Sequence, residues 1–126
     1  MSDIATAPRP AVPTTLSGIV ADAFARVPDA PFLRTVDGTV STYRDADRQS
    51  LQLRVALNRA GVQPGDRVAV QVEKSPFSLM LYLACLRTGA VYVPLNTGYT
   101  EPEVEYVVND VEPAVIVTVN SSVLPA

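Results

Sequence analysis

The sequence predicts an α/β fold, in which a β-hairpin and helices precede a βαβαβ unit with parallel strands. Three observations predict this class. Strand-like and helix-like segments alternate from Arg67 onward, as they do in parallel sheets. Asp37-Gly38 separates two strand-like runs, as in a hairpin. Residues 114–119 are apolar on both faces, which is expected of a central parallel strand.

The first predicted elements are a helix and the hairpin. Apolar residues recur at spacings of three and four over residues 16–26, which indicates a helix that ends before Pro28. Residues 32–36 and 39–43 predict two strands. Between them, Asp37-Gly38 favours a two-residue turn, because this dipeptide readily takes positive φ angles.

A capping box predicts where the next helix begins. The Thr42 hydroxyl would accept a hydrogen bond from the N–H of Asp45, and Gly61 would close the helix after Ala60. Its buried face is expected to carry Ala46, Leu53, Leu57 and Ala60, and its exposed face Arg48, Gln52, Arg54 and Asn58.

A strand and a buried helix follow. The turn 64–66 leads into a predicted strand over residues 67–72. Residues 76–88 predict a helix that is apolar nearly all round and therefore buried. Ser75 would be its N-cap, with proline at the first helical position and Gly89 just past the end.

The pattern then repeats. Residues 90–95 predict a strand that Pro94 stops, and residues 96–99 a loop. The capping box from Thr100 to Glu103 opens a helix that ends near residue 110, before the strand 114–119. Two successive βαβ units predict a parallel sheet with right-handed crossovers.

Composition excludes several kinds of function. The net charge is −3, and the basic residues are scattered, so nucleic acid is not an expected partner. One cysteine and no histidine exclude an internal disulfide and histidine-based relays, and fit a cytoplasmic protein. The longest apolar run, residues 79–86, is far shorter than the roughly 20 residues of a membrane helix, so no membrane partner is expected. Residues 1–14, rich in proline, are expected to form a disordered leader.

The run Leu-Arg-Thr-Gly-Ala-Val-Tyr-Val-Pro-Leu-Asn at residues 86–96 resembles the second core motif of adenylate-forming enzymes. Ser-Thr-Tyr at residues 41–43, followed by an acidic residue, is similar to their first core motif, and Gly-Asp-Arg-Val-Ala at 65–69 to a segment between the two. Order and spacing agree from about residue 16 to residue 119. Within this superfamily, residues 71–75 and 94–100 look most like malonyl-CoA synthetases.

The resemblance implies a two-step ligase reaction in the full-length family. A carboxylate attacks the α-phosphate of ATP, which gives an acyl adenylate and pyrophosphate. The thiol of coenzyme A then displaces AMP, and Mg²⁺ would offset phosphate charge in the first step. The substrate would be a small carboxylic acid, such as malonate or a similar short acid.

This chain lacks the family's phosphate-binding loop. Its six glycines are isolated from one another, so no glycine-rich loop can cradle phosphates. Residues 15–126 are therefore expected to be a partial N-terminal AMP-binding domain that stops before that loop. By itself such a segment would be inactive scaffold, with no catalytic residue, no metal site and no tight binding of ATP, Mg²⁺ or coenzyme A.

Four residues are candidates for ligand contact. Lys74 follows the predicted strand 67–72, and Asn96, Thr97 and Tyr99 follow the next strand. These positions share one edge of a parallel sheet, where ligands usually bind. The structural alternatives are a solvated lysine beside Glu73, and turn or capping roles for the other three.

Other polar residues have structural interpretations. Cys85 lies in the apolar helix with no histidine to activate it, which favours core packing over a nucleophilic role. Glu101, Glu103 and Glu105 suit the first turns of a helix, where its dipole favours negative charge, rather than a metal site.

Two other functions stay open. Amino-acid-activating domains of peptide synthetases share the Gly-Ala-x-Tyr-x-Pro motif, but usually have Ile-Asp where this chain has Leu95-Asn96. A small flavodoxin-like binding module without enzymatic activity would need a final helix, and no helical pattern follows residue 119.

Overall fold

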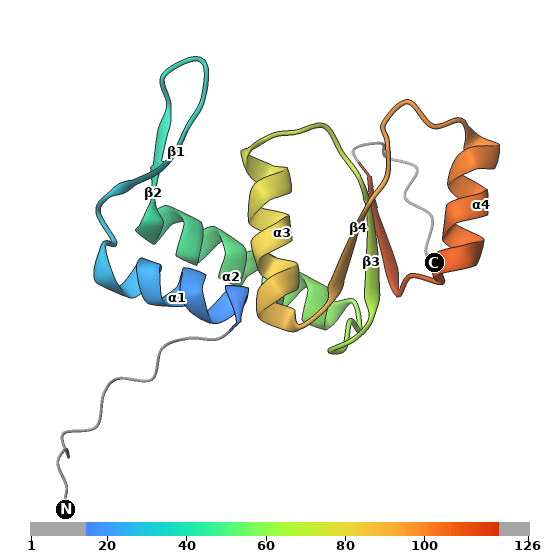
Figure 1. The fold of residues 1–126 in the computed structure, drawn as a ribbon, viewed down its shortest axis with the longest axis horizontal. Helices are drawn as coiled ribbons and strands as arrows, with labels where there is room; N and C mark the ends of the chain where they lie inside the picture. The colour runs from blue at the N-terminus through green and yellow to red at the C-terminus, as the bar shows by residue number, and fades with distance from the viewer. Residues whose placement is uncertain (1–14, 119–126) are drawn as a thin grey trace, which may run out of the picture.

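The computed structural model describes residues 15–118, and Figure 1 shows their arrangement. The predicted leader 1–14 and the end of the predicted last strand lie outside this range. The elements in chain order are α1 (Leu16–Arg26), β1 (Pro31–Arg34), β2 (Val40–Thr42), α2 (Tyr43–Arg59), β3 (Arg67–Gln71), α3 (Pro76–Thr88), β4 (Val91–Pro94), α4 (Glu101–Val111) and β5 (Val115–Thr118). The predicted order of helices and strands is confirmed, and α1 has the predicted bounds.

The hairpin forms as predicted, but its turn does not have two residues. Strands β1 and β2 pair antiparallel. The N–H of Thr35 donates to the carbonyl of Thr39, and the N–H of Gly38 donates to the carbonyl of Thr35, so residues 36–38 form the loop. Only Gly38 takes a positive φ, of 91°. Asp37 keeps a negative φ because its carboxylate accepts from the N–H of Thr39 and from the Thr35 hydroxyl, which stabilises a three-residue loop instead.

The predicted helix starts are confirmed by their capping groups. Capping boxes are present at Thr42 with Asp45, at Ser75 with Ser78 and at Thr100 with Glu103. Helix α3 ends at Gly89, which has a φ of 82°. Thus short-range hydrogen bonds fix where each of these helices begins and ends.

One predicted core position of α2 is wrong. Ala46 and Leu57 are buried and Leu53 is half-buried, as expected, but Ala60 is exposed. Ala60 is the C-cap, where the chain leaves the helix toward Gly61, which has a φ of 91°. The turn carries the next apolar residue, Val62, into the core in its place, with 2% of its surface exposed.

The three C-terminal strands form a parallel sheet in the order β4-β3-β5. Helices α2 and α3 lie on one side of this sheet and α4 on the other (Figure 1). The central strand among the described residues is β3, whereas β5 was expected to be central and lies at an edge. Every residue of β5 is half-buried, in agreement with its edge position.

Two groups of apolar side chains form the core. The first joins the α3 side of the sheet to α2 and α3, through Leu57, Val62, Val68, Val70, Leu81, Ala84, Cys85 and Ala90. The second joins α1, the hairpin, α2 and α3, through Phe24, Ala46, Met80 and Leu83. Helix α4 has no fully buried residue, so it is the least covered helix of the described part.

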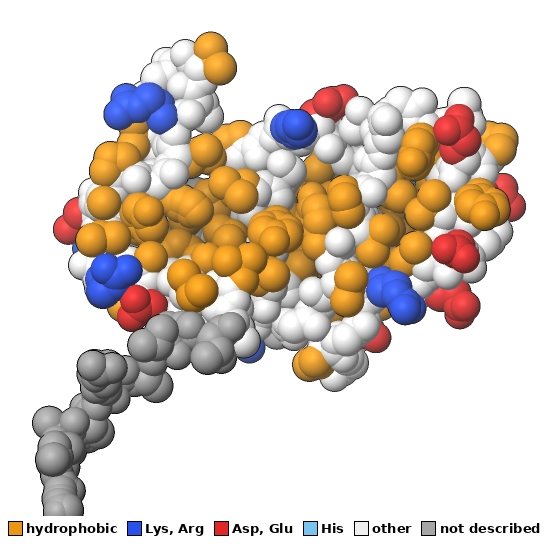
Figure 2. Space-filling model, in the orientation of Figure 1, with side chains coloured by type: hydrophobic (Ala, Val, Ile, Leu, Met, Phe, Trp, Pro, Cys, Tyr) orange, Lys and Arg blue, Asp and Glu red, His pale blue; other side chains and the backbone are white. Residues whose placement is uncertain are grey.

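Apolar side chains also gather on the surface. Figure 2 shows them in a broad band that crosses one face of the molecule from α1 over α3 toward the sheet. Leu16, Ile19, Phe77 and Val91 are among the large apolar side chains that are 43–52% exposed. Within residues 15–118, no helix combines the length and the apolarity needed to span a bilayer.

Candidate functional site

The carboxyl ends of β3 and β4 diverge and leave a hollow between them. After β3 the chain turns toward α3, on one side of the sheet, whereas after β4 it turns toward α4, on the other (Figure 1). Neighbouring parallel strands whose connections leave in opposite directions create a crevice at this edge, which is where open α/β sheets bind ligands. The hollow has a volume of about 460 Å³.

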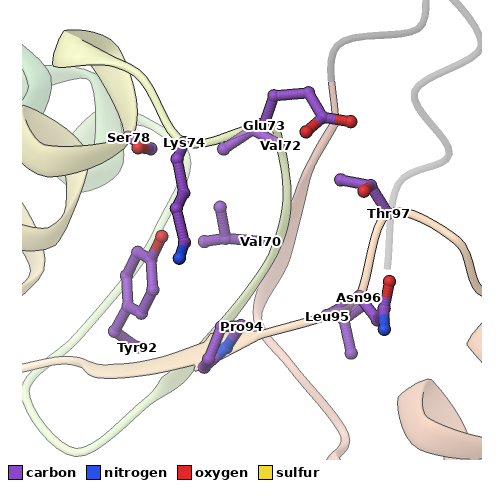
Figure 3. A pocket seen from close by; sticks show the side chains of 10 residues that line it. All are labelled: Val70, Val72, Glu73, Lys74, Ser78, Tyr92, Pro94, Leu95, Asn96 and Thr97. Atoms are coloured by element: carbon purple, nitrogen blue, oxygen red, sulfur yellow. The ribbon is translucent and has the colours of Figure 1, made fainter.

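Residues from three segments line this hollow (Figure 3). Strand β3 and the loop after it, the first turn of α3, and β4 with the loop after it each contribute. The lining residues are Val70, Val72, Glu73, Lys74, Ser78, Tyr92, Pro94, Leu95, Asn96 and Thr97. We call this hollow the switch-point pocket.

The switch-point pocket brings together three of the four candidate residues. Lys74, Asn96 and Thr97 all line it, although they come from two different loops. Tyr99 does not line it: its N–H donates to the carbonyl of Asn96 at 3.0 Å, which closes a turn. The prediction that these loops meet at one sheet edge therefore agrees with the geometry for Lys74, Asn96 and Thr97.

Asn96 organises the loop after β4. Its Oδ1 accepts from the N–H of Gly98 at 2.8 Å, and its carbonyl accepts from Nε2 of Gln71 at 3.0 Å. These bonds tie the loop to itself and to the end of β3. The turn role left open by the sequence is thus present, and it holds the pocket wall in place.

Lys74 lies at the start of α3 without a carboxylate partner. Within the described part of the chain, it takes part in no ion pair, and Figure 3 shows its side chain extending over the sheet beside Tyr92. Glu73 points to the opposite side of the pocket, toward Thr97 (Figure 3). Lys74 is exposed, so the alternative of a solvated lysine beside Glu73 agrees with the structure.

Tyr92 and Ser78 line the pocket but were not singled out in the sequence. Tyr92 packs edge-on against Tyr82, with ring centroids 5.3 Å apart, and burial raises the pKa of its hydroxyl. Ser78 caps α3. The place of Tyr92 follows from its pairing in register with Val68, whose side chain faces α3, and this pairing is not readable from the sequence.

The phosphate-binding loop that the resemblance implies is not among the described residues that line the pocket. Among the described residues, the five residues with positive φ are separated along the chain, so no run of backbone N–H groups forms a phosphate cradle. No three His, Cys, Asp or Glu side chains of residues 15–118 converge to hold a metal ion such as Mg²⁺. Cys85 is fully buried, and burial raises its pKa to about 11, which suits a core residue.

Comparison with known proteins agrees with this architecture. Residues 20–126 match the family described as AMP-binding enzyme. The chain is 37% identical over 105 residues to enterobactin synthase component F of Escherichia coli, covering 83% of this chain and 8% of that protein. It is 36% identical over 106 residues to a long-chain-fatty-acid–CoA ligase of Bacillus subtilis, covering 84% and 19%.

A solved structure shares the fold. The apo structure of MatB from Rhodopseudomonas palustris superimposes with a TM-score of 0.73 at 37% identity, covering 79% of this chain and 20% of that chain. The chain thus spans about a fifth or less of the length of these relatives. The match over residues 20–126, together with the parallel sheet and the switch-point pocket, shows that the chain belongs to the AMP-binding enzyme family.

Proposed function

We propose that this chain serves as the N-terminal part of an AMP-dependent acyl-CoA synthetase. The whole enzyme would convert a carboxylic acid, ATP and coenzyme A into acyl-CoA, AMP and pyrophosphate. The observation that carries the proposal is the family match over residues 20–126 of a chain whose sheet leaves a pocket at its switch point. The similarity to a fatty-acid–CoA ligase supports coenzyme A as the acceptor.

In this proposal, residues 15–126 belong to a larger AMP-binding domain. Two features support it. The chain covers only 8–20% of the proteins compared above. Large apolar side chains such as Ile19 are exposed, at 52% for Ile19. Figure 2 shows apolar side chains in a band across one face, and such a band is a surface that further protein can cover.

The chemistry would be divided between this segment and the rest of the enzyme. The attack of a carboxylate on the α-phosphate needs cations and backbone N–H donors around the phosphates. Over residues 15–118, this segment offers Lys74 but no phosphate loop and no cluster of carboxylates for Mg²⁺. It would therefore hold and shape the site, while the phosphate-binding and metal-binding groups come from elsewhere in the domain.

The substrate would be a short acid such as malonate. This part of the proposal rests on the resemblance of residues 71–75 and 94–100 to malonyl-CoA synthetases. Both segments line or flank the switch-point pocket, which at about 460 Å³ has room for a small ligand.

A direct assay tests the proposal. The full-length protein would be incubated with ATP, Mg²⁺, coenzyme A and a series of acids from acetate to long-chain fatty acids, with malonate included. AMP release and the mass of the acyl-CoA product would be measured. Formation of malonyl-CoA supports the full proposal, and preference for another acid changes only the substrate. Absence of acid-dependent AMP release would contradict it.

A second candidate function is the adenylation part of a peptide synthetase. The identity to enterobactin synthase component F favours it, because that protein is named as a synthase component and not as a CoA ligase. The adenylate would then pass to a thiol on a carrier protein. Amino-acid-dependent exchange of pyrophosphate into ATP, without acyl-CoA formation, would identify this alternative.

A further inference from the structure

Lys74 is the only lysine in the sequence, and it lines the switch-point pocket. The other nine basic residues are arginines. Four of them, Arg26, Arg44, Arg48 and Arg87, form ion pairs with aspartates in the part of the chain that the structure describes. Lys74 forms none there, and its ammonium group is directed over the pocket beside Tyr92 (Figure 3).

The start of the helix that follows Lys74 uses the N–H groups of Ser75 and Ser78 in its own capping box. The N–H of Ser75 donates to the Ser78 hydroxyl, and the N–H of Ser78 donates to the Ser75 hydroxyl. Pro76 has no N–H. A ligand at this end of the pocket would therefore find the Lys74 ammonium and the Tyr92 hydroxyl as side-chain donors, while the capping box already uses the N–H groups of Ser75 and Ser78.

The surroundings favour a negative ligand near Lys74. Val70, Val72 and Pro94 supply apolar lining beside the exposed Lys74 side chain, so the ammonium group is open to a ligand of opposite charge. The nearest acidic lining residue, Glu73, points toward Thr97 at the other side (Figure 3). The pocket thus has a cationic end and an acidic end.

We infer that the cationic end of the switch-point pocket binds an anionic oxygen group of a ligand, with Lys74 as the charged donor and the Tyr92 hydroxyl as a second donor. The group is a carboxylate or a phosphate, since both present the oxygens that an ammonium group recognises. This inference rests on the proposed function, in which the ligands are a carboxylic acid, ATP and coenzyme A. It makes Lys74 a binding residue and not a catalytic one.

The test compares variants of the full-length protein. Lys74→Met removes the charge and keeps an unbranched side chain, and Lys74→Arg keeps the charge. Arg54→Met is the matched control, because Arg54 is exposed and forms no ion pair within residues 15–118. Tyr92→Phe removes only the second donor. Kd values for ATP, coenzyme A and malonate would be measured by calorimetry, and KM and kcat by AMP release.

Lys74→Met is expected to weaken binding of one of the three ligands by roughly tenfold or more, with a matching rise in KM and kcat within about twofold. Lys74→Arg should stay within a few-fold of the wild type, Tyr92→Phe should give a smaller loss for the same ligand, and Arg54→Met should give none. A loss for ATP or coenzyme A identifies the group as phosphate, and a loss for malonate identifies it as carboxylate.

Two outcomes overturn the inference: Kd values for all three ligands within twofold of the wild type in Lys74→Met, or a wild-type protein that binds none of them. Calorimetry does not depend on turnover. A Lys74-dependent Kd in a protein that makes no acyl-CoA would contradict the proposed function and leave this subsite standing. Acyl-CoA formation together with unchanged Kd values in Lys74→Met would support the proposed function and contradict this subsite.

Discussion

Arg87 of α3 and Asp47 of α2 form an ion pair, with 2.7 Å between Nη1 and Oδ1. The same guanidinium donates to the Ser50 hydroxyl at 2.9 Å and lies 5.3 Å from the centre of the Phe24 ring. Arg87 therefore connects α1, α2 and α3. Only 15% of the Arg87 side chain is exposed, whereas 39% of the Asp47 side chain is, so the pair is shielded from water on the Arg87 side alone.

Replacing Arg87 should destabilise the fold. Arg87→Met would leave the fully buried Ser50 without one of its partners and would remove the partner of the half-exposed Asp47 carboxylate, and we expect a loss of about 1–3 kcal/mol. Urea unfolding followed by circular dichroism would measure it. Arg48→Met is the control, because the Arg48–Asp45 pair is 3.5 Å apart and exposed, and should cost no more than about 1 kcal/mol. Equal losses in the two variants would contradict this prediction.

Gly89 and Gly61 should differ in how well they tolerate alanine. Both have positive φ angles, of 82° and 91°, so alanine costs about 1–2 kcal/mol of backbone strain at either. At Gly89, a Cβ atom would also lie 3.3 Å from Cβ of Pro64, whereas at Gly61 it would meet nothing within 4 Å. Thermal unfolding should therefore show Gly89→Ala as the less stable variant by about 1 kcal/mol. Equal melting temperatures would mean that the loop around Pro64 moves away from the added Cβ atom without any loss of stability.

The features predicted correctly from the sequence depend on residues close together in the chain. Thr42 and Asp45, Ser75 and Ser78, and Thr100 and Glu103 are three residues apart, and each pair fixes a helix start. Residue types at this spacing predict two of these pairs as capping boxes and Ser75 as a cap. Gly89 ends α3 because only glycine readily takes its φ angle.

The features missed from the sequence depend on competing or distant contacts. At Asp37, a side-chain hydrogen bond to the N–H of Thr39 overrode the turn preference of the Asp-Gly pair. The edge position of β5 follows from its pairing with β3, whose paired residues lie 47 positions earlier in the chain, as for Val68 and Val115, and periodicity does not reveal this pairing. The same holds for the site: Lys74 and Asn96 were found from strand ends, but the part played by Tyr92 needed the register of β3 with β4.

Cys85 should be unreactive until the protein unfolds. It is the only cysteine, it is fully buried, and burial raises the pKa of its thiol from 9.0 to about 11. At pH 8 the native thiol is therefore protonated and shielded, and its reaction with a disulfide reagent should follow the unfolded population. Rapid labelling in native buffer, at the rate seen in urea, would contradict its burial.

The same shift makes stability depend on pH. Because the folded pKa of Cys85 lies above the unfolded value, its contribution is complete below pH 9 and is lost as pH rises through about 11. The free energy of unfolding should thus fall between pH 9 and 11 more steeply in the wild type than in Cys85→Ala. Tyrosines titrate in both proteins, and the difference reports the thiol together with its smaller effect on the pKa of Tyr92, which burial and the nearby Cys85 both raise. Parallel pH profiles would show that the folded thiol titrates normally.

Asn96 should control the order of the loop that walls the switch-point pocket. Asn96→Ala removes the Oδ1 acceptor that lies 2.8 Å from the N–H of Gly98, while Asn96→Asp keeps an acceptor at the same place. We expect the Gly98 amide to exchange with solvent roughly tenfold faster in the alanine variant and near the wild-type rate in the aspartate variant. Hydrogen exchange followed by NMR would measure both rates, with the Ala90 amide, which donates to the carbonyl of Cys85, as an internal reference. If the Gly98 amide exchanges equally fast in all three proteins, the hydrogen bond to Asn96 does not hold the loop, and the backbone bonds of the turn alone determine the shape of the pocket wall.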